Sequence, residues 1–352
     1  MISASHRPSI PPFAEEPPIG RPVRICHDLN ADTFRGEVLP GGQPVLIKGL
    51  VKSWPAVEAS LESDERVVAY LKRLDAGRPA SVSISPPDQD GLFFFTPDMT
   101  GFNFTTDVRP IPILLDWLLA HRTQPAVSTI YSQSLILHDF MPDFMRLHPL
   151  DLVPPDAPPR LWIGNRVRTP THFDPSHNLA CLVAGKRRFT LFPPEQICNL
   201  YPGPIDRGPG GVPVSMAQIE APDFEKYPLL AEALRHAQFA DLEPGDALYI
   251  PYSWWHHVQS RAPFNLLVNY WWSEAKMARP ALFSPLFLAI ATWRDLPDDE
   301  KVLWKRLMDL YVFGDHKTMA AHLPTEGKGL SGPITYEVVR RLKAFMKSVV
   351  DR

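Results

Sequence analysis

The sequence predicts a mainly β fold with helices (α+β), whose core is an antiparallel double-stranded β-helix of about eight strands, the jelly roll. Three observations predict it. Short apolar runs with period-2 alternation recur between Tyr131 and Trp272. Proline and glycine separate the runs, as turns between strands require. Helical periodicity is concentrated in the flanks, before the first of these strands and after the last.

The composition fits a large core and disfavours a nucleic-acid partner. The chain has 352 residues, of which 45% are hydrophobic, so it can bury a sizeable core. Its 36 basic and 39 acidic side chains leave a formal charge of -3, which provides no field for recruiting nucleic acid or an anionic membrane. The three cysteines lack a Cys-x-x-Cys spacing, which argues against a disulfide framework and favours a cytoplasmic protein.

Residues 1–30 are predicted to form a Pro-rich N-terminal arm. Prolines recur from Pro8 to Pro22 and deny the segment ladder hydrogen bonds. The arm is expected to be either an extended strap or a disordered lead. It lacks the apolar stretch of a signal peptide, and no later segment has the ~18 uninterrupted apolar residues of a membrane span. The sequence therefore predicts no membrane association.

The region before the jelly roll is predicted to be an α/β flank. PVLIKGL, starting at Pro44, has the pattern of a strand and a glycine turn, and residues 63–74 have helical spacing. SVSIS, GLFFF and FNFTT are predicted to be strands, and residues 111–120 a short helix. Five phenylalanines in this flank are predicted to be core residues in preference to lining a substrate cleft: Phe93, Phe94, Phe95, Phe102 and Phe104.

Two segments carry the chemistry: TPTHFDPSHNLACLVAGKRRFTLFPP at 169–194 and GDALYIPYSWWHHVQS at 245–260. In the first, His172 and Asp174 flank Phe173 on an extended run, so both polar side chains point to one face of a strand. In the second, His256 or His257 follows an apolar strand. Two imidazoles and one carboxylate are typical of a non-haem Fe(II) site, which leaves coordination positions for a bidentate co-substrate and dioxygen.

The two segments resemble those of the JmjC and cupin-like 2-oxoglutarate oxygenases, and most closely the asparaginyl hydroxylase type, the factor inhibiting hypoxia-inducible factor. The resemblance spans roughly Pro44 to Trp272. It implies a JmjC-like cupin core that uses Fe(II), 2-oxoglutarate and O2. It also implies that His172, Asp174 and His256 are the catalytic metal ligands. His257 would then point to the opposite side of its strand, because neighbouring strand residues alternate.

The same resemblance implies residues that contact the co-substrate. The resemblance assigns a co-substrate contact to a basic residue fifteen positions after the first ligand. It assigns the same role to Tyr131, Thr169, Asn178, Asn269 and Trp271. For Asn178, Asn269 and Trp271 the alternative interpretation is ordinary barrel lining.

The basic position departs from the family pattern. The asparaginyl hydroxylase type has lysine there, whereas this chain has Arg187 between Lys186 and Arg188. Alternation places Arg187 inward, and a guanidinium can grip the distal carboxylate of 2-oxoglutarate through two hydrogen bonds. A register slip that brings Lys186 inward is the alternative, but it would also turn Phe189 and Leu191 around.

Two rival functions fit the motifs less well. A cupin with three His and one Glu ligand would show His-x-His followed closely by Glu, whereas here Asp174 is followed by Asn178. A non-catalytic cupin that serves only as a binding module would normally lack a ligand, and all three are present. The sequence therefore predicts a dioxygenase that hydroxylates a C–H bond, releases succinate and CO2, and needs no general base. A protein or peptide side chain is the first choice of substrate; a small-molecule hydroxylase and a lysine demethylase are the alternatives.

These inferences divide the chain into an arm (1–30), a catalytic domain (31–275) and a C-terminal helical region (276–352). The jelly roll is expected at about 130–272, with an insertion at 193–237. The insertion has a Gly-Pro-rich loop and a predicted helix from Pro222 to about His236, and it is the candidate substrate-covering lid. In the helical region Asp298 or Asp299 is expected to cap a helix. In the resembled family the C-terminal helices form a homodimer, which is the expectation here.

Overall fold

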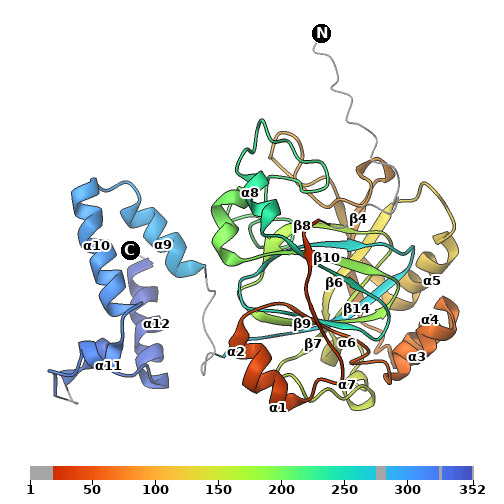
Figure 1. Ribbon diagram of the computed structural model, residues 1–352, viewed down its shortest axis with the longest axis horizontal. Coiled ribbons are helices and arrows are strands. Elements are labelled where there is room, and N and C mark those ends of the chain that lie inside the picture. Colours follow the sequence, from red (N-terminus) through yellow and green to blue (C-terminus); the bar gives the residue numbers. More distant parts are fainter. Residues whose placement is uncertain (1–18, 275–282, 325–326, 351–352) are drawn as a thin grey trace, which may run out of the picture. The chain divides into compact units, whose positions relative to one another are not determined.

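The computed structural model describes residues 19–274, 283–324 and 327–350. The chain divides into two compact units, Met1–Ser273 and Glu274–Arg352 (Figure 1). The predicted arm up to residue 18 lies outside the described residues.

The first unit is built on eight consecutive strands that form two facing layers, which confirms the predicted jelly roll. One layer has the order β11-β10-β13-β8 and the other β12-β9-β14-β7. The strands are β7 (Pro159–Gly164), β8 (Arg168–Phe173), β9 (His177–Ala184), β10 (Arg187–Phe192), β11 (Gln238–Leu242), β12 (Ala247–Ile250), β13 (Trp255–Ser260) and β14 (Asn265–Trp272).

Earlier strands extend both layers. Within the described residues, β1 (Arg21–Pro22) completes a five-stranded sheet, here called the small sheet. The other layer grows into a nine-stranded large sheet by adding β2 (Arg24–Cys26), β3 (Val45–Ile47), β4 (Pro79–Ser85), β5 (Thr105–Pro110) and β6 (Thr129–Ile136). Because β1 pairs with β11 and β2 pairs with β3, the described end of the predicted arm is a strap that links the two sheets.

The barrel interior lies between the two layers. Alternate residues of β9, β10, β13 and β14 point into it, among them Leu182, Phe189, Leu191 and Leu267. The intervening residues of the large sheet, such as Val183 and Val268, belong to a second core on its other face. The side of each barrel strand that faces the interior is therefore set by period-2 patterning.

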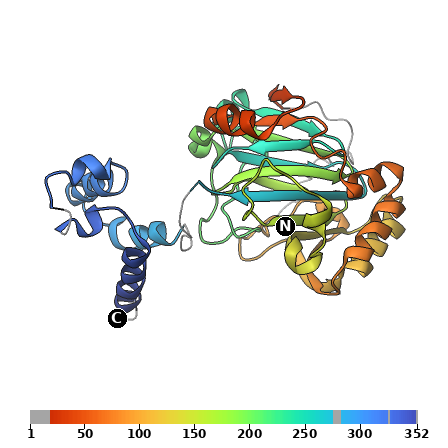
Figure 2. The ribbon, with the colours of Figure 1, turned by 90° about the horizontal axis from the view of Figure 1, so that it is seen from below.

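Helices of the N-terminal flank cover the outer face of the large sheet (Figure 2). The predicted helix at 63–74 is confirmed as α4 (Asp64–Leu74), whose first turn is capped by the Ser63 side chain. The other helices of this flank are α1 (Ala31–Thr33), α2 (Leu39–Gly41), α3 (Pro55–Glu62), α5 (Ile111–His121), α6 (Leu137–Phe140) and α7 (Phe144–Leu147). A π-helix, Phe34–Val38, joins α1 to α2.

Three predicted elements differ from the structure. GLFFF forms isolated bridges at Leu92 and Phe95 and no strand, because the phenylalanine rings pack on one another and Leu92 bridges to Arg168 of β8. In FNFTT the strand begins only at Thr105. The predicted helix from Pro222 shrinks to α8 (Leu230–Arg235), since Pro228 has no N–H for the helical ladder.

The second unit is helical. Its helices are α9 (Ser284–Trp293), α10 (Asp298–Tyr311), α11 (His316–Met319) and α12 (Tyr336–Val350). Trp293 and Trp304 stack with ring centroids 4.7 Å apart and join α9 to α10. The expected aspartate cap is wrong, because Pro297 occupies the N-cap position and Asp298 begins the first turn. No described helix is long and apolar enough to cross a membrane.

Candidate metal centre

Three predicted ligands converge inside the mouth of the barrel. His172 lies near the end of β8, Asp174 directly follows that strand, and His256 lies at the start of β13. His256 is the register partner of His172, and their ring centroids are 4.3 Å apart. One potential ligand atom from each of the three residues lies within 4.8 Å of the others. Antiparallel pairing therefore assembles a ligand set from two distant segments.

Both imidazoles are oriented by the backbone. His172 Nδ1 lies 2.8 Å from the carbonyl oxygen of Pro170, and His256 Nδ1 lies 3.1 Å from that of Trp254. A carbonyl only accepts, so each Nδ1 donates, and each Nε2 is the nitrogen left to face a metal ion. The Oδ2 atom of Asp174 is buried and has no hydrogen-bond partner among the described residues. This combination of donors fits a divalent metal ion.

The electrostatics of the site agree with this orientation. Burial, together with the nearby His172, holds the pKa of His256 well below 6.5, so its imidazole is neutral, as a ligand must be. Burial raises the pKa of the Asp174 carboxyl group, although His172 and the Trp271 side chain oppose that rise. A bound cation would stabilise the ionised carboxylate that burial disfavours.

A second polar group lies deeper in the same interior. Arg187 is 3% exposed, and its Nη2 donates to Ser260 Oγ at 3.0 Å. Its Nε has no hydrogen-bond partner, and it forms no ion pair with any described residue. Burial raises the pKa of Tyr131, whereas the adjacent Arg187 and a hydrogen bond with Thr169 oppose that rise. Tyr131, Thr169 and Arg187 therefore meet at the end of the barrel away from the candidate ligands, here called the closed end.

Thr169 reaches this end through a bulge in β8. His256 pairs with His172 and Val258 pairs with Thr169, so β8 has one more residue than β13 between the two pairs. Strict alternation from His172 would have turned Thr169 outward, and the extra residue turns it inward.

The neighbours of Arg187 point elsewhere. Lys186 is exposed, whereas Arg188 lies on the outer face of the small sheet and forms two 2.7 Å hydrogen bonds with the Asp241 carboxylate. The structure thus places Arg187 inside the barrel in the predicted register, without the slip to Lys186.

The remaining predicted residues lie on the inner face of the large sheet. Asn269 Nδ2 donates to Asn178 Oδ1 at 3.0 Å, and Trp162 Nε1 donates to Asn269 Oδ1 at 2.6 Å. Trp271 packs edge-on against Trp162, with centroids 5.7 Å apart. Trp162 and Ser260 were missed in the sequence; the alternation of RLWIGN would have identified Trp162 as facing the interior.

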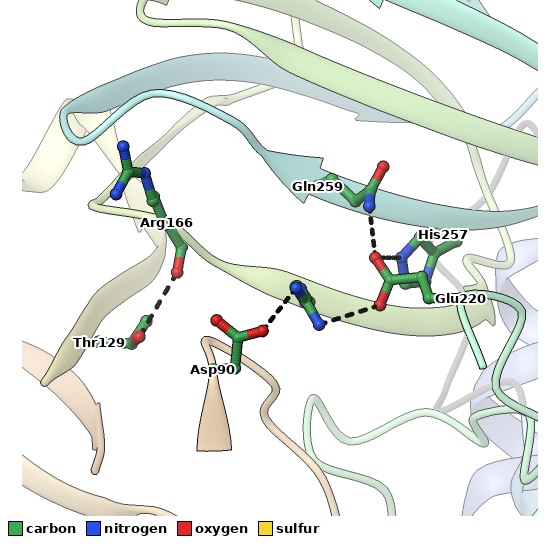
Figure 3. Close-up of polar contacts among 7 residues, drawn as sticks. Asp90, Thr129, Arg166, Glu220, His257 and Gln259 are labelled. Atoms are coloured by element: carbon green, nitrogen blue, oxygen red, sulfur yellow. Dashed lines mark hydrogen bonds and ion pairs between the residues drawn. The ribbon is translucent and has the colours of Figure 1, made fainter. Parts of the chain in front are cut away.

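The outer face of the small sheet carries a separate buried network (Figure 3). His257 Nε2 lies 3.3 Å from Glu220 Oε1, to which Gln259 also donates a hydrogen bond. Arg168 lies 3.7 Å from Glu220 and 2.7 Å from Asp90. Burial would raise the pKa of Glu220, but His257, Arg168 and Gln259 outweigh it and lower the pKa to about 2. His257 is therefore engaged away from the metal centre.

The insertion that contains Glu220 is attached to β8, the strand that carries the candidate ligand His172. Val214 forms a bridge with His172, and Ser215 N donates to the Thr171 carbonyl at 2.7 Å. Its apolar residues, including Ile219, pack against Trp255 on the outer face of the small sheet. The predicted lid is thus fixed beside a candidate ligand.

The predicted aromatic cluster is only partly core. Phe93 and Phe95 are buried, whereas Phe102 is exposed. Phe94 and Phe95 line a cavity of about 980 Å³, together with Met216 and Tyr227 of the insertion. None of the three candidate ligands lines that cavity, so it is distinct from the metal centre.

The fold and the ligand set together define a jelly-roll protein of the JmjC and cupin class. The chain belongs to the family described as Cupin-like domain, which matches residues 31–277.

Several curated proteins are similar to the chain. "Jumonji C domain-containing protein 5" of Drosophila melanogaster is 27% identical over 248 residues, 69% of this chain and 58% of that protein. "Lysine-specific demethylase JMJ31" of Arabidopsis thaliana is 36% identical over 118 residues, 33% of this chain and 21% of that protein. "HSPB1-associated protein 1" of Homo sapiens is 39% identical over 113 residues, 32% of this chain and 22% of that protein.

The chain thus covers less than two thirds of each of these relatives. They place it among JmjC proteins without singling out the asparaginyl hydroxylase type.

Proposed function

We propose that this protein is an Fe(II)- and 2-oxoglutarate-dependent oxygenase that hydroxylates a C–H bond of a protein or peptide side chain. One observation carries the proposal: the barrel interior contains both a three-residue ligand set and, deeper, a buried guanidinium with no anionic partner among the described residues. A metal site alone fits many cupins. The added uncompensated cation fits a co-substrate that carries a distal carboxylate.

The ligand set supports iron. Two imidazole nitrogens and one carboxylate from one side of the ion leave positions for a bidentate co-substrate and dioxygen. Among the described residues the cluster has no fourth His, Cys, Asp or Glu, as the cupins with three His and one Glu would require. His172, Asp174 and His256 would hold the metal.

The residues at the closed end account for the proposed co-substrate contacts. Arg187, Tyr131 and Thr169 would bind the distal carboxylate of 2-oxoglutarate, and Asn178, Asn269 and Trp271 would flank its metal-chelating end. Iron, 2-oxoglutarate and dioxygen, when bound, supply the oxidising chemistry that yields succinate, CO2 and a hydroxylated product. The chain itself orients these groups and shields them from water, and no side chain is assigned as a general base.

Three finer points belong to this proposal. The first-choice substrate is a protein or peptide, and small-molecule hydroxylation and lysine demethylation are the alternatives. The protein is proposed to be cytoplasmic. It is also proposed to form a homodimer through the helical unit, because α9 and α10 contain no buried residue and expose large apolar side chains such as Phe287 and Leu303. Analytical ultracentrifugation of the full chain measures whether it is a dimer.

The test is succinate formation from 2-oxoglutarate by the purified protein, with and without Fe(II), beside a His172→Ala control. Iron-dependent succinate that disappears in the control is the expected result. Because some oxygenases turn over poorly without their substrate, 2-oxoglutarate is also titrated calorimetrically into the Mn(II)-loaded protein under argon. If the loaded protein neither binds 2-oxoglutarate nor forms succinate, the oxygenase proposal is wrong and a binding module is the better description.

A further inference from the structure

A second arginine faces the barrel interior at its open end. Arg160 is the second residue of β7 and shares its inner face with Trp162, whereas Leu161 and Ile163 belong to the core on the other face. Four positions separate it from Gly164, where β7 reaches the turn at the closed end, which corresponds to roughly 13 Å along a strand. Arg160 therefore lies far from the closed end, at which Arg187 meets Tyr131.

The Arg160 guanidinium is held in place but not neutralised. Nη1 donates to Ser134 Oγ at 2.9 Å, and Cζ lies 5.2 Å from the ring centroid of Trp271. Nε is buried without a hydrogen-bond partner, and no ion pair joins Arg160 to any described residue. The side chain as a whole is only partly buried. Donors therefore remain for a ligand that enters the mouth.

The support for Arg160 is built into the neighbouring strand. Ser134 has a φ of 55°, a left-handed conformation that is uncommon for residues other than glycine. It lies in the register shift of β6 between Ser132 and Leu135. Such irregularities occur near functional sites, where they redirect a side chain. Here the result is a hydroxyl that fixes the guanidinium.

Trp271 connects this guanidinium to the metal centre. The indole ring lies under the Arg160 guanidinium. The same side chain is close enough to Asp174 to oppose the rise that burial causes in the pKa of that carboxyl group. Arg160 is thus one aromatic side chain away from a candidate metal ligand.

We propose that Arg160 is a specificity-determining residue that binds a carboxylate of the substrate next to the C–H bond to be hydroxylated. The proposal rests on the proposed oxygenase function and narrows its substrate class. A guanidinium recognises carboxylate through paired hydrogen bonds, and partial burial strengthens them. The same charge repels a lysine or arginine side chain at the mouth, which disfavours lysine demethylation. The carboxylate belongs either to an Asp or Glu of a peptide or to a small organic acid.

The experiment uses the full-length protein loaded with Mn(II), with and without 2-oxoglutarate, under argon. The peptide probes are two degenerate nonapeptide libraries that differ only in a fixed central Glu or Gln. The small-molecule probes are N-acetyl amino acids and their C-terminal amides. Binding is measured by the relaxation that Mn(II) induces in the probe protons, which reports closeness to the metal and requires no turnover.

The wild-type protein is expected to bind the acid members of one probe set about tenfold more tightly than the amide members. Arg160→Gln should remove this preference and Arg160→Lys should retain part of it. The matched control is Arg146→Gln, which changes an exposed arginine on α7. Preference within the peptides identifies a protein substrate, and preference within the N-acetyl amino acids a small acid.

Three outcomes would overturn the proposal: equal binding of acids and amides, binding of neither probe set, or an Arg160→Gln variant that keeps the preference. If Arg160→Gln weakens the binding of 2-oxoglutarate as strongly as Arg187→Met does, Arg160 belongs to the co-substrate site. The proposal is then also wrong. Failure of the oxygenase function is distinguishable, because it appears as absent 2-oxoglutarate binding in the wild type. Arg160→Lys keeps the test valid if the glutamine variant fails to fold.

Discussion

The two faces of the small sheet carry the same residue types in opposite situations. His256 and Arg187 point inward, and their immediate neighbours His257 and Arg188 point outward. All four side chains are buried. The outward pair is matched by carboxylates, His257 by Glu220 and Arg188 by Asp241. Among the described residues, Arg187 has no such partner.

The difference separates a structural role from a binding role. Removing a guanidinium from water costs several kcal/mol unless a partner compensates for it, and on the outer face the protein provides that partner. On the inner face the described residues leave the charge uncompensated, which under the proposed function would stabilise a complex with an anionic ligand at the expense of the free protein. Burial alone does not distinguish the two roles. The presence or absence of a carboxylate partner among the described residues does.

The largest contrast is expected between the tandem histidines. His256→Ala should weaken metal binding by about 10³-fold or more, because it removes one of three ligands. His257→Ala should leave metal affinity within about threefold, since its ring faces Glu220. Titration of Mn(II) by electron paramagnetic resonance measures both. Equal losses in the two variants would erase the distinction between the faces.

The second-largest contrast is expected between the adjacent arginines Arg187 and Arg188. Arg187→Met is expected to weaken 2-oxoglutarate binding by about 100-fold, the usual scale for losing one partner of a buried charge pair, and to leave the unliganded protein as stable as before or more so. Arg188→Met should leave that affinity unchanged and lower stability by about 1 kcal/mol, because Asp241 loses its bidentate partner. Calorimetric titration and urea unfolding check these values. A destabilised Arg187→Met protein would contradict the proposed anion-binding role of Arg187.

The smallest effect concerns the partner on the outer face. The pKa of Glu220 falls from 4.5 to about 2 on folding, so its contribution to stability is complete above pH 4.5 and is lost as the pH falls toward 2. Glu220→Gln should therefore lower stability at pH 7 by about 1–3 kcal/mol and flatten the decline in acid, with metal affinity retained. Urea unfolding between pH 3 and 7 measures this. If the variant loses stability in acid as steeply as the wild type does, other carboxylates dominate that decline.

Much of the centre could be predicted because it lies on regular strands. The shared face of His172 and Asp174 and the inward direction of Arg187 follow from period-2 alternation in segments whose apolar residues fix the register. The choice of His256 over His257 came from the family resemblance. The jelly roll followed from the same pattern.

The rest depended on irregular backbone. Nothing in the residues around Thr169 reveals the bulge that turns it inward, and its assignment came from resemblance alone. Glu220 lies in an insertion without periodicity, so its contact with His257 is a tertiary event that no local pattern encodes. The same holds for the bend at Ser134 that supports Arg160. Local patterns predict which side of a regular strand a residue occupies, and they fail where register shifts.

The strand that carries His172 is an edge strand, yet its free edge is occupied. The chain bridges to it near both ends, through Leu92 at Arg168 and through Val214 at His172. A peptide therefore has no open stretch of backbone along which to add itself as a further strand. A polypeptide substrate must instead present its target side chain end-on, through the mouth of the barrel. Exposed loops and chain termini, more than sheet edges of partner proteins, are the places where such a side chain is presented.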